Sequence, residues 1–187
     1  MGVLMDLVAG DAREILLALG VDDWAGLRDP RRFVAYISLG GGMDPARLDL
    51  FSRAARETTG RNASVAFSEA THALQSRMVA VSDRTVERID PHWIDDVARL
   101  PEGQLDRIAS RWIDLIGCEE CEVDPDEKPM LRELAGDLLA FCRRAQDAEA
   151  VVLDSEQHAH PEGQQRVGQL ACAGMAEVGD GGMGDRE

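Results

Sequence analysis

The segment from residue 78 to residue 116 constrains the fold of this chain more than any other part of the sequence. Met78–Val81 is uncharged and contains two β-branched valines, which is typical of a buried strand. Ser82 and Asp83 follow at once, and their side chains can accept hydrogen bonds from the free N–H groups at a helix start. We therefore predict a strand, a helix cap and two or three helices in quick succession.

The last helix of this segment has a clear apolar face. From Gln104 onward, apolar side chains recur at helical spacing, and charged or polar side chains occupy the opposite face. The apolar positions are Leu105, Ile108, Trp112, Leu115 and Ile116. Trp93 and Trp112 are the largest apolar side chains of the segment, so we expect both of them in one core.

Similar patterns on both sides of this segment predict the remaining elements. The predicted strands lie at residues 3–8, 33–39 and 150–153, and the predicted helices at residues 11–19, 44–57 and 129–145. Asp44-Pro45 is a strong helix start, because an Asp cap is followed by Pro in the first turn. The sequence thus predicts a helix-rich α+β fold, in which several amphipathic helices pack on a small mixed sheet.

The predicted domain organisation is one globular domain followed by a tail. A chain of 187 residues with 44% hydrophobic residues is long enough to bury a core without disulfides or metals. We place the single globular α+β domain at residues 1–153. Residues 154–187 are rich in Gly and acidic side chains and contain no aromatic residue, so we predict a disordered tail. A chain that ends at Ser155 should accordingly keep its thermal midpoint.

The charge of the chain argues against several classes of partner. There are 35 acidic and 20 basic side chains, a formal net charge of −15, which disfavours nucleic acid and anionic lipid. A basic protein is the partner that such a charge attracts. No apolar run reaches the length of a membrane span, and the first residues lack the basic region of a secretory signal. We therefore expect a cytoplasmic protein that binds neither membranes nor nucleic acid.

Cys118 and Cys121 form a Cys-x-x-Cys pair. Two thiolates at this spacing can hold half of a zinc site, and His158 and His160 in the tail could supply the other ligands. A redox pair is a second reading, although the acidic side chains around both cysteines would raise their thiol pKa values. Ordinary loop cysteines are the third reading, and the one we favour.

A second candidate constellation lies at the start of a helix. His92 follows Pro91, and Asp95 and Asp96 come within the next helical turn. A histidine beside carboxylates can transfer protons, so these three residues are a candidate acid–base site. A histidine at this position also occurs without any role in catalysis, close to the helix cap.

Four short motifs resemble a family of small bacterial proteins of unknown function, which open with Met-Gly-Val-Leu-x-Asp. The motifs are the opening MGVLMD, the helix start MDP, the step VAVS and the helix end AFCRRA. They occur in the same order as in the family and cover residues 1 to about 153. The resemblance implies a compact domain of helices and strands, and it implies no activity.

Together, these features favour a non-enzymatic, cytoplasmic protein-binding module that meets a basic protein through an acidic face. The concrete form that we favour is an immunity- or antitoxin-like inhibitor. The alternative is a small enzyme or metal-binding protein that uses Cys118 and Cys121, or His92, Asp95 and Asp96. We expect no cofactor.

Overall fold

The computed structural model describes residues 2–60, 66–73, 84–119 and 123–158 of the chain. Within this part, a five-stranded sheet has the strand order β2-β1-β5-β4-β3, and all its neighbouring strands are antiparallel. The strands are β1 (Gly2–Gly10), β2 (Ala35–Gly41), β3 (Thr71–Ala73), β4 (Arg84–Ile89) and β5 (Ala150–His158). The α+β class predicted from sequence is confirmed, with an antiparallel sheet in place of a mixed one.

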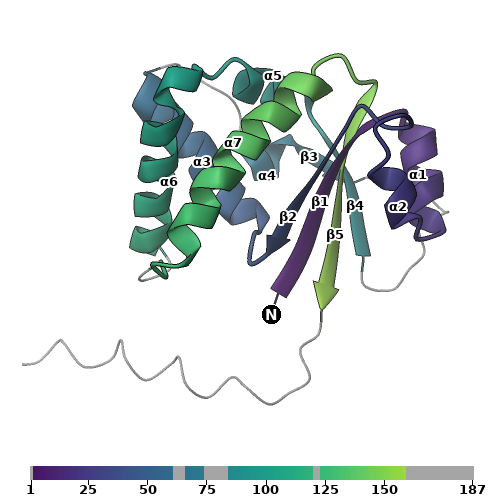
Figure 1. Ribbon diagram of the computed structural model, residues 1–187, viewed down its shortest axis with the longest axis horizontal. Coiled ribbons are helices and arrows are strands. Elements are labelled where there is room, and N and C mark those ends of the chain that lie inside the picture. The colour runs from purple at the N-terminus through teal and green to yellow at the C-terminus, as the bar shows by residue number, and fades with distance from the viewer. Residues whose placement is uncertain (1, 61–65, 74–83, 120–122, 159–187) are drawn as a thin grey trace, which may run out of the picture.

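Helices cover the two faces of the sheet unequally (Figure 1). One face carries α3 (Pro45–Thr59), α4 (Phe67–Ala70), α5 (Pro91–Ala98), α6 (Leu105–Glu119) and α7 (Glu127–Ala145), and a short 3₁₀ helix, η1 (Glu102–Gln104), precedes α6. Of the described helices, α1 (Ala12–Gly20) and α2 (Trp24–Leu27) lie on the other face. We call these the large face and the small face.

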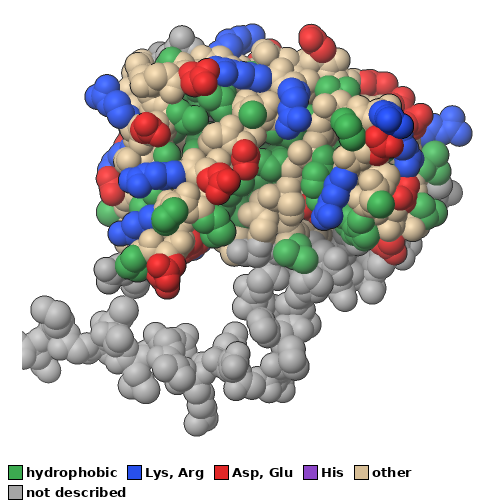
Figure 2. Space-filling view, in the orientation of Figure 1, with side chains coloured by type: hydrophobic (Ala, Val, Ile, Leu, Met, Phe, Trp, Pro, Cys, Tyr) green, Lys and Arg blue, Asp and Glu red, His purple; other side chains and the backbone are tan. Residues whose placement is uncertain are grey.

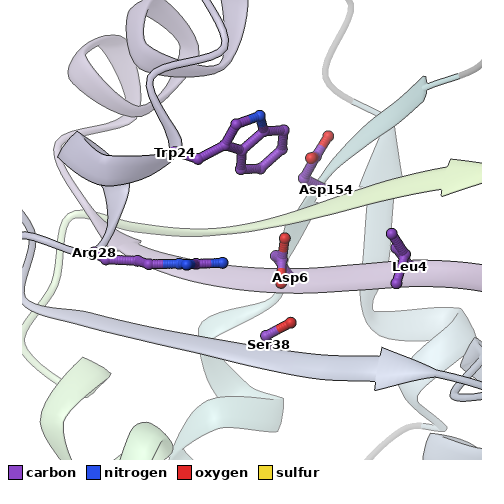
Figure 3. Close-up of a pocket in the computed structure, with 6 residues that line it drawn as sticks. All are labelled: Leu4, Asp6, Trp24, Arg28, Ser38 and Asp154. Atoms are coloured by element: carbon purple, nitrogen blue, oxygen red, sulfur yellow. The ribbon is translucent and has the colours of Figure 1, made fainter.

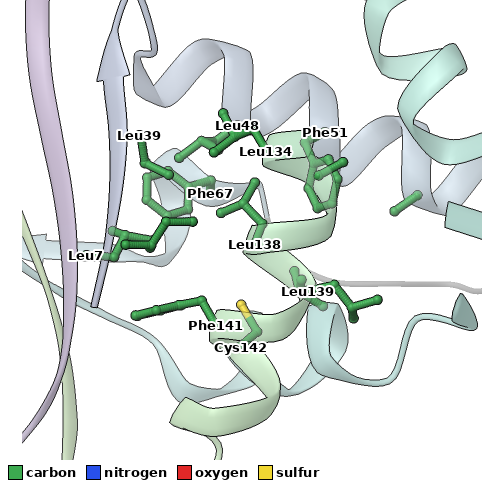
Figure 4. Packing of buried hydrophobic residues seen from close by; sticks show 14 of the residues in the cluster. Leu7, Leu39, Leu48, Phe51, Phe67, Leu134, Leu138, Leu139, Phe141 and Cys142 are labelled. Atoms are coloured by element: carbon green, nitrogen blue, oxygen red, sulfur yellow. The ribbon is translucent and has the colours of Figure 1, made fainter. Parts of the chain in front are cut away.

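The main core of the protein lies between the large face of the sheet and the helices that pack on it. Trp93 and Trp112 are 1% and 0% exposed and belong to one cluster, which confirms the prediction made for them. Each makes an edge-to-face contact with a phenylalanine, Trp93 with Phe67 at 4.8 Å and Trp112 with Phe51 at 5.1 Å between ring centroids. Figure 4 shows how α7 contributes to the same core, with Leu134, Leu138, Leu139, Phe141 and Cys142 all buried.

The strands follow the alternation that a sheet covered on both faces requires. On β1, Met5, Leu7 and Ala9 belong to the large core, while Val8 belongs to the smaller cluster under α1 and α2. Val8 pairs with Val152 on β5, and both are fully buried beneath α1. The small face is thus apolar where α1 lies over it.

Helix starts follow the capping signals in the sequence. Asp11 accepts a hydrogen bond from the backbone N–H of Glu14 at 2.8 Å and caps α1. Asp44 accepts one from the N–H of Arg47, also at 2.8 Å, and Pro45 is the first residue of α3. The predicted starts of both helices are confirmed.

The structure corrects one prediction for the central segment, that of a helix directly after Asp83. The predicted strand at Met78–Val81 and the cap at Ser82 and Asp83 lie outside the described residues. The structure places the strand β4, not a helix, directly after Asp83. The helix α5 begins only at Pro91, after the cap Asp90. Strand β4 is mostly polar, and it pairs with β5. This long-range pairing, and not a local pattern, determines its conformation.

The last strand is longer than predicted. Residues 154–158 continue β5, because they pair with residues 2–6 of β1, from Asp154 with Asp6 to His158 with Gly2. The domain boundary predicted after residue 153 therefore falls inside β5. The rest of the predicted tail, residues 159–187, lies outside the described residues.

Candidate binding pocket

Beyond α2, the small face of the sheet is hollowed into a pocket of about 340 Å³ (Figure 3). Its walls come from β1, β2, β5 and the segment around α2. The lining residues are Leu4, Asp6, Trp24, Arg28, Ser38 and Asp154. None of these residues was singled out as a site candidate from the sequence.

Strand register brings the polar side chains of the pocket into one row. Asp6 on β1 pairs with Asp154 on β5 on one side and with Ser38 on β2 on the other. Residues paired across neighbouring strands point to the same face, so all three side chains line the floor of the pocket. The next row along the strands is Tyr36, Val8 and Val152, whose two valines are buried under α1.

An irregularity in β2 adjoins this row. The pairing of β1 with β2 shifts between Met5 and Asp6, since Met5 pairs with Gly40 whereas Asp6 pairs with Ser38. Gly40 has a φ of 75°, in the left-handed region that favours glycine. Regular pairing ends at Ser38 and Asp6, so the bulge lies at Leu39, directly beside the polar row.

The two carboxylates are unfavourable neighbours for a sheet. Like charges directly opposite each other on paired strands destabilise the pairing, and burial of a carboxylate adds a desolvation cost. Asp154 is only 3% exposed, and Asp6 is half-buried. A sequence selected for stability alone would place apolar or oppositely charged side chains here. Such local conflicts are most often found at functional sites.

A hydrogen-bonded chain of side chains runs from Asp6 to the rim of the pocket. The hydroxyl of Tyr36 donates a hydrogen bond to Oδ1 of Asp6 at 3.0 Å, and Nη2 of Arg28 donates one to the Tyr36 oxygen at 3.4 Å. The Arg28 guanidinium also lies over the Tyr36 ring, 5.4 Å from its centroid. Burial, with a smaller effect of the Asp6 carboxylate, raises the pKa of Tyr36, so its phenol stays protonated and continues to donate.

Trp24 is held at the opposite rim by a compact turn. Asp23 caps α2 by accepting from the Gly26 N–H at 2.9 Å, and Arg32 donates to the same carboxylate at 2.6 Å. The Arg32 hydrogen bond, followed by that of Gly26, lowers the pKa of Asp23. A Cβ at Gly26 would lie 2.1 Å from the Asp23 carboxylate oxygen and 2.3 Å from Nη1 of Arg32, so a larger residue there would displace these two side chains from each other. The indole of Trp24 is thereby placed over the pocket floor (Figure 3).

The chemistry of this pocket is that of a cation-binding site. Carboxylate oxygens and a serine hydroxyl accept hydrogen bonds from N–H donors, and an indole face attracts a positive charge. A guanidinium or ammonium group offers both the charge and the donors. Among the lining residues that the structure describes, none is a cysteine or a histidine.

The structure places His92, Asp95 and Asp96 on the exposed side of α5. The imidazole of His92 is 88% exposed, and its Nδ1 lies 2.8 Å from Oδ1 of Asp90. Asp95 and Asp96 instead pair with Arg99, at 3.1 Å and 3.9 Å. The hydrogen bond that His92 donates to Asp90, then the Asp90 charge, and more weakly the charges of Asp95 and Asp96, raise the pKa of His92. Catalysis by these residues stays an untested prediction.

Only one cysteine of the Cys-x-x-Cys pair lies among the described residues. Cys118 is exposed near the end of α6, and Cys121 lies outside the described residues. Within the described ranges, no group of three or more His, Cys, Asp or Glu side chains is arranged to hold a metal ion. Cys142, on α7, is buried, and burial raises the pKa of its thiol far above the usual range. The zinc and redox readings of Cys118 and Cys121 stay predictions.

One sequence signal could have indicated the pocket. Asp6 interrupts an otherwise apolar strand, and Asp154 directly follows the apolar run Val151–Leu153. Apolar stretches of this kind are typical of buried strands, so an acidic residue within or directly after one of them indicates a polar position next to the core. Their proximity, however, depends on a register between strands at opposite ends of the described chain.

Comparison with known proteins gives no relative for this chain. No family model matches it, and no curated protein or solved structure is detectably similar to it. The resemblance of its short motifs to a bacterial family thus stays a prediction. Among the described helices, none is long and apolar enough to cross a bilayer.

Proposed function

We propose that this chain is a non-enzymatic binding protein whose pocket accepts a basic side chain, arginine or lysine, of a partner protein. The observation that carries the proposal is the pairing of Asp6 with Asp154 on the floor of a pocket that Trp24 covers. A partner's cation would place an opposite charge beside these two like-charged side chains and could donate hydrogen bonds to both.

The size of the pocket supports a side chain as the ligand. Its volume of about 340 Å³ lies at the lower end of ligand pockets, which range over roughly 300–1,000 Å³. A long side chain with a charged end fits such a volume, whereas a dinucleotide or a similar large cofactor does not. The pocket would thus hold one anchor residue of a larger interface.

The distribution of charge supports the same partner. The formal net charge of −15 would speed the approach of a basic protein. On the face seen in Figure 2, however, acidic and basic side chains are interspersed, and no single acidic patch stands out. We therefore assign recognition to the pocket and not to a broad acidic face. An immunity- or antitoxin-like inhibitor of a basic protein would use such an anchor site.

The test uses a defined probe on the full-length chain. L-argininamide carries the guanidinium, and L-citrullinamide has nearly the same shape without the side-chain charge. We expect argininamide to bind with a dissociation constant on the order of millimolar, as suits a single side chain, and citrullinamide to bind at least about tenfold more weakly. Because Trp24 lines the pocket, its indole NMR signal should report the binding, while those of the buried Trp93 and Trp112 stay unchanged.

Matched variants separate the pocket from net charge. Asp154→Asn and Asp6→Asn should each weaken argininamide binding by about tenfold or more, since each removes one carboxylate from the floor. Asp137→Asn removes the same charge from an exposed position on α7 and should leave binding nearly unchanged. Equal binding of the two probes, or equal effects of Asp154→Asn and Asp137→Asn, would refute the proposal.

A further inference from the structure

We infer that Arg28 is an internal competitor for the pocket, a cation of this chain that a partner's basic side chain must displace. The inference rests on the proposed function, because it concerns how the same pocket becomes accessible. It makes Arg28 a residue that determines specificity, and not a residue that binds the ligand.

The position of Arg28 resembles that of the proposed ligand. Its guanidinium stacks on an aromatic ring, that of Tyr36, and is linked through the Tyr36 hydroxyl to the Asp6 carboxylate. An aromatic face combined with a carboxylate is the environment that binds a guanidinium from outside. Figure 3 shows the Arg28 side chain extending along the pocket toward Asp6. The Asp6 end of the pocket thus already contains a positive charge.

The interactions that hold the Arg28 side chain in the pocket are weak enough for a ligand to displace it. Within the described residues, its side chain makes one hydrogen bond, at 3.4 Å, to an uncharged phenol, and the residue is exposed. The attraction of Asp6 for Arg28 is the smallest of the influences that raise the Arg28 pKa, after the hydrogen bond and charge interaction with Tyr36. A single long hydrogen bond between an exposed guanidinium and a phenol contributes little to stability. Displacement therefore needs no more than a ligand with a better hydrogen-bonding geometry.

The backbone beneath Arg28 does not have to move for this exchange. Arg28 is the C-terminal cap of α2, and its φ of −88° and ψ of −7° are ordinary helical values. The capping carboxylate of Asp23, with its bonds to Gly26 and Arg32, fixes the turn on which Arg28 stands. A rotation about the side-chain bonds of Arg28 is enough to open the Asp6 end, while Trp24 remains in place.

Competition of this kind reduces the affinity for every external cation. If the pocket is open only a fraction of the time, the apparent dissociation constant rises by the inverse of that fraction. Weak monodentate cations would then fail to displace Arg28. A ligand that reaches Asp6 and Asp154 together would succeed, since Asp154 lies beside Asp6 on the next strand.

The experiment compares argininamide binding by the full-length wild type, Arg28→Gln and Arg31→Gln. Arg28→Gln removes the competitor, so we expect binding to tighten by about three- to tenfold. Arg31 is an exposed arginine three positions further along, and Arg31→Gln makes the same change in net charge. It should alter binding by less than about twofold, because exposed charges are screened over such distances. Backbone NMR spectra confirm that each variant is folded.

The outcomes separate this inference from the proposed function. Weaker or unchanged binding by Arg28→Gln, with clear binding by the wild type, refutes the competition and leaves the cation pocket standing. If Arg28→Gln weakens the binding of L-arginine but not that of L-argininamide, Arg28 binds the carboxylate of the ligand. The inference is wrong in that case too. If neither wild type nor Arg28→Gln binds argininamide, both proposals fail. Binding by Arg28→Gln alone would be the strongest support for competition.

Discussion

Removal of the Trp112 side chain should lower the free energy of unfolding strongly. It is fully buried, packs edge-to-face on Phe51, and donates its indole N–H to the carbonyl oxygen of Arg47 at 2.7 Å. Trp112→Ala would empty a large site and leave that carbonyl without its donor. We expect a loss of about 3–5 kcal/mol in the free energy of unfolding, measured by urea denaturation.

Trp24→Ala is the matched control for this measurement. Trp24 is only half-buried and stands at the rim of a pocket, so its removal leaves no closed cavity. Its loss should cost about 1 kcal/mol or less. Similar urea midpoints for the two variants would show that Trp112 contributes less to the core than its burial indicates.

His92 should make stability depend on pH in a defined direction. The hydrogen bond that the His92 imidazole donates to the Asp90 carboxylate raises the folded-state pKa of His92 above its ordinary value of 6.5. A raised pKa means that the folded state binds the proton more tightly than the unfolded state. This stabilisation is complete below pH 6.5 and is lost as the pH rises through the folded-state pKa. An NMR titration of the imidazole should show the raised value.

Asp90→Asn isolates the cause of that shift. The asparagine oxygen can still accept the hydrogen bond from the His92 backbone N–H, at 2.8 Å in the wild type, so the cap of α5 is retained. The charge beside the imidazole is lost, and the pKa of His92 should fall toward 6.5. A pKa that stays raised in Asp90→Asn would assign the shift to Asp95 and Asp96 instead.

Strand β5 reverses one expectation drawn from the sequence. The polar residues after Leu153 suggested that a chain ended at Ser155 would be as stable as the full chain. In the structure, Glu156, Gln157 and His158 pair with Leu4, Val3 and Gly2, and Glu156 also pairs with Arg84. Removal of these pairs should cost about 1–3 kcal/mol, at roughly 1 kcal/mol for each backbone hydrogen bond.

A chain ended after His158 provides the comparison. It keeps the whole of β5, so its thermal midpoint should match that of the full chain. The chain ended after Ser155 should unfold several degrees lower, since 1 kcal/mol corresponds to about 2–4 °C in a domain of this size. Equal midpoints for both truncated chains would show that the end of β5 adds no stability.

Helices were easier to predict from this sequence than strands. The apolar face of α6 and the Asp-Pro start of α3 are local signals, and the structure confirms both. Strand β4 has no such signal, because Val86 faces the small cluster and Ile89 the large core, with charged residues between them. Its conformation comes from pairing with β5, which is distant in sequence.

The pocket could not be predicted from the sequence, because it also depends on contacts between distant segments. It needs the register that joins Asp6 to Asp154 and to Ser38, and the unequal cover of the two faces by helices. None of these is encoded within a single segment. The predicted candidates at His92 and Cys118 came from local spacing, which is the only kind of signal that one sequence offers for such sites.

The position of β5 determines when this protein can fold during synthesis. β5 is the last element of the described chain, yet it lies between β1 and β4 and is the strand that joins the two halves of the sheet. At about 5–20 residues per second, a ribosome needs roughly 8–30 s to go from β1 to β5. Throughout that interval the β5-facing edge of β1 has no partner strand, and the same holds for β4 from the time it is synthesised until β5 follows. Chaperones that bind extended apolar segments would meet the nascent chain in that state.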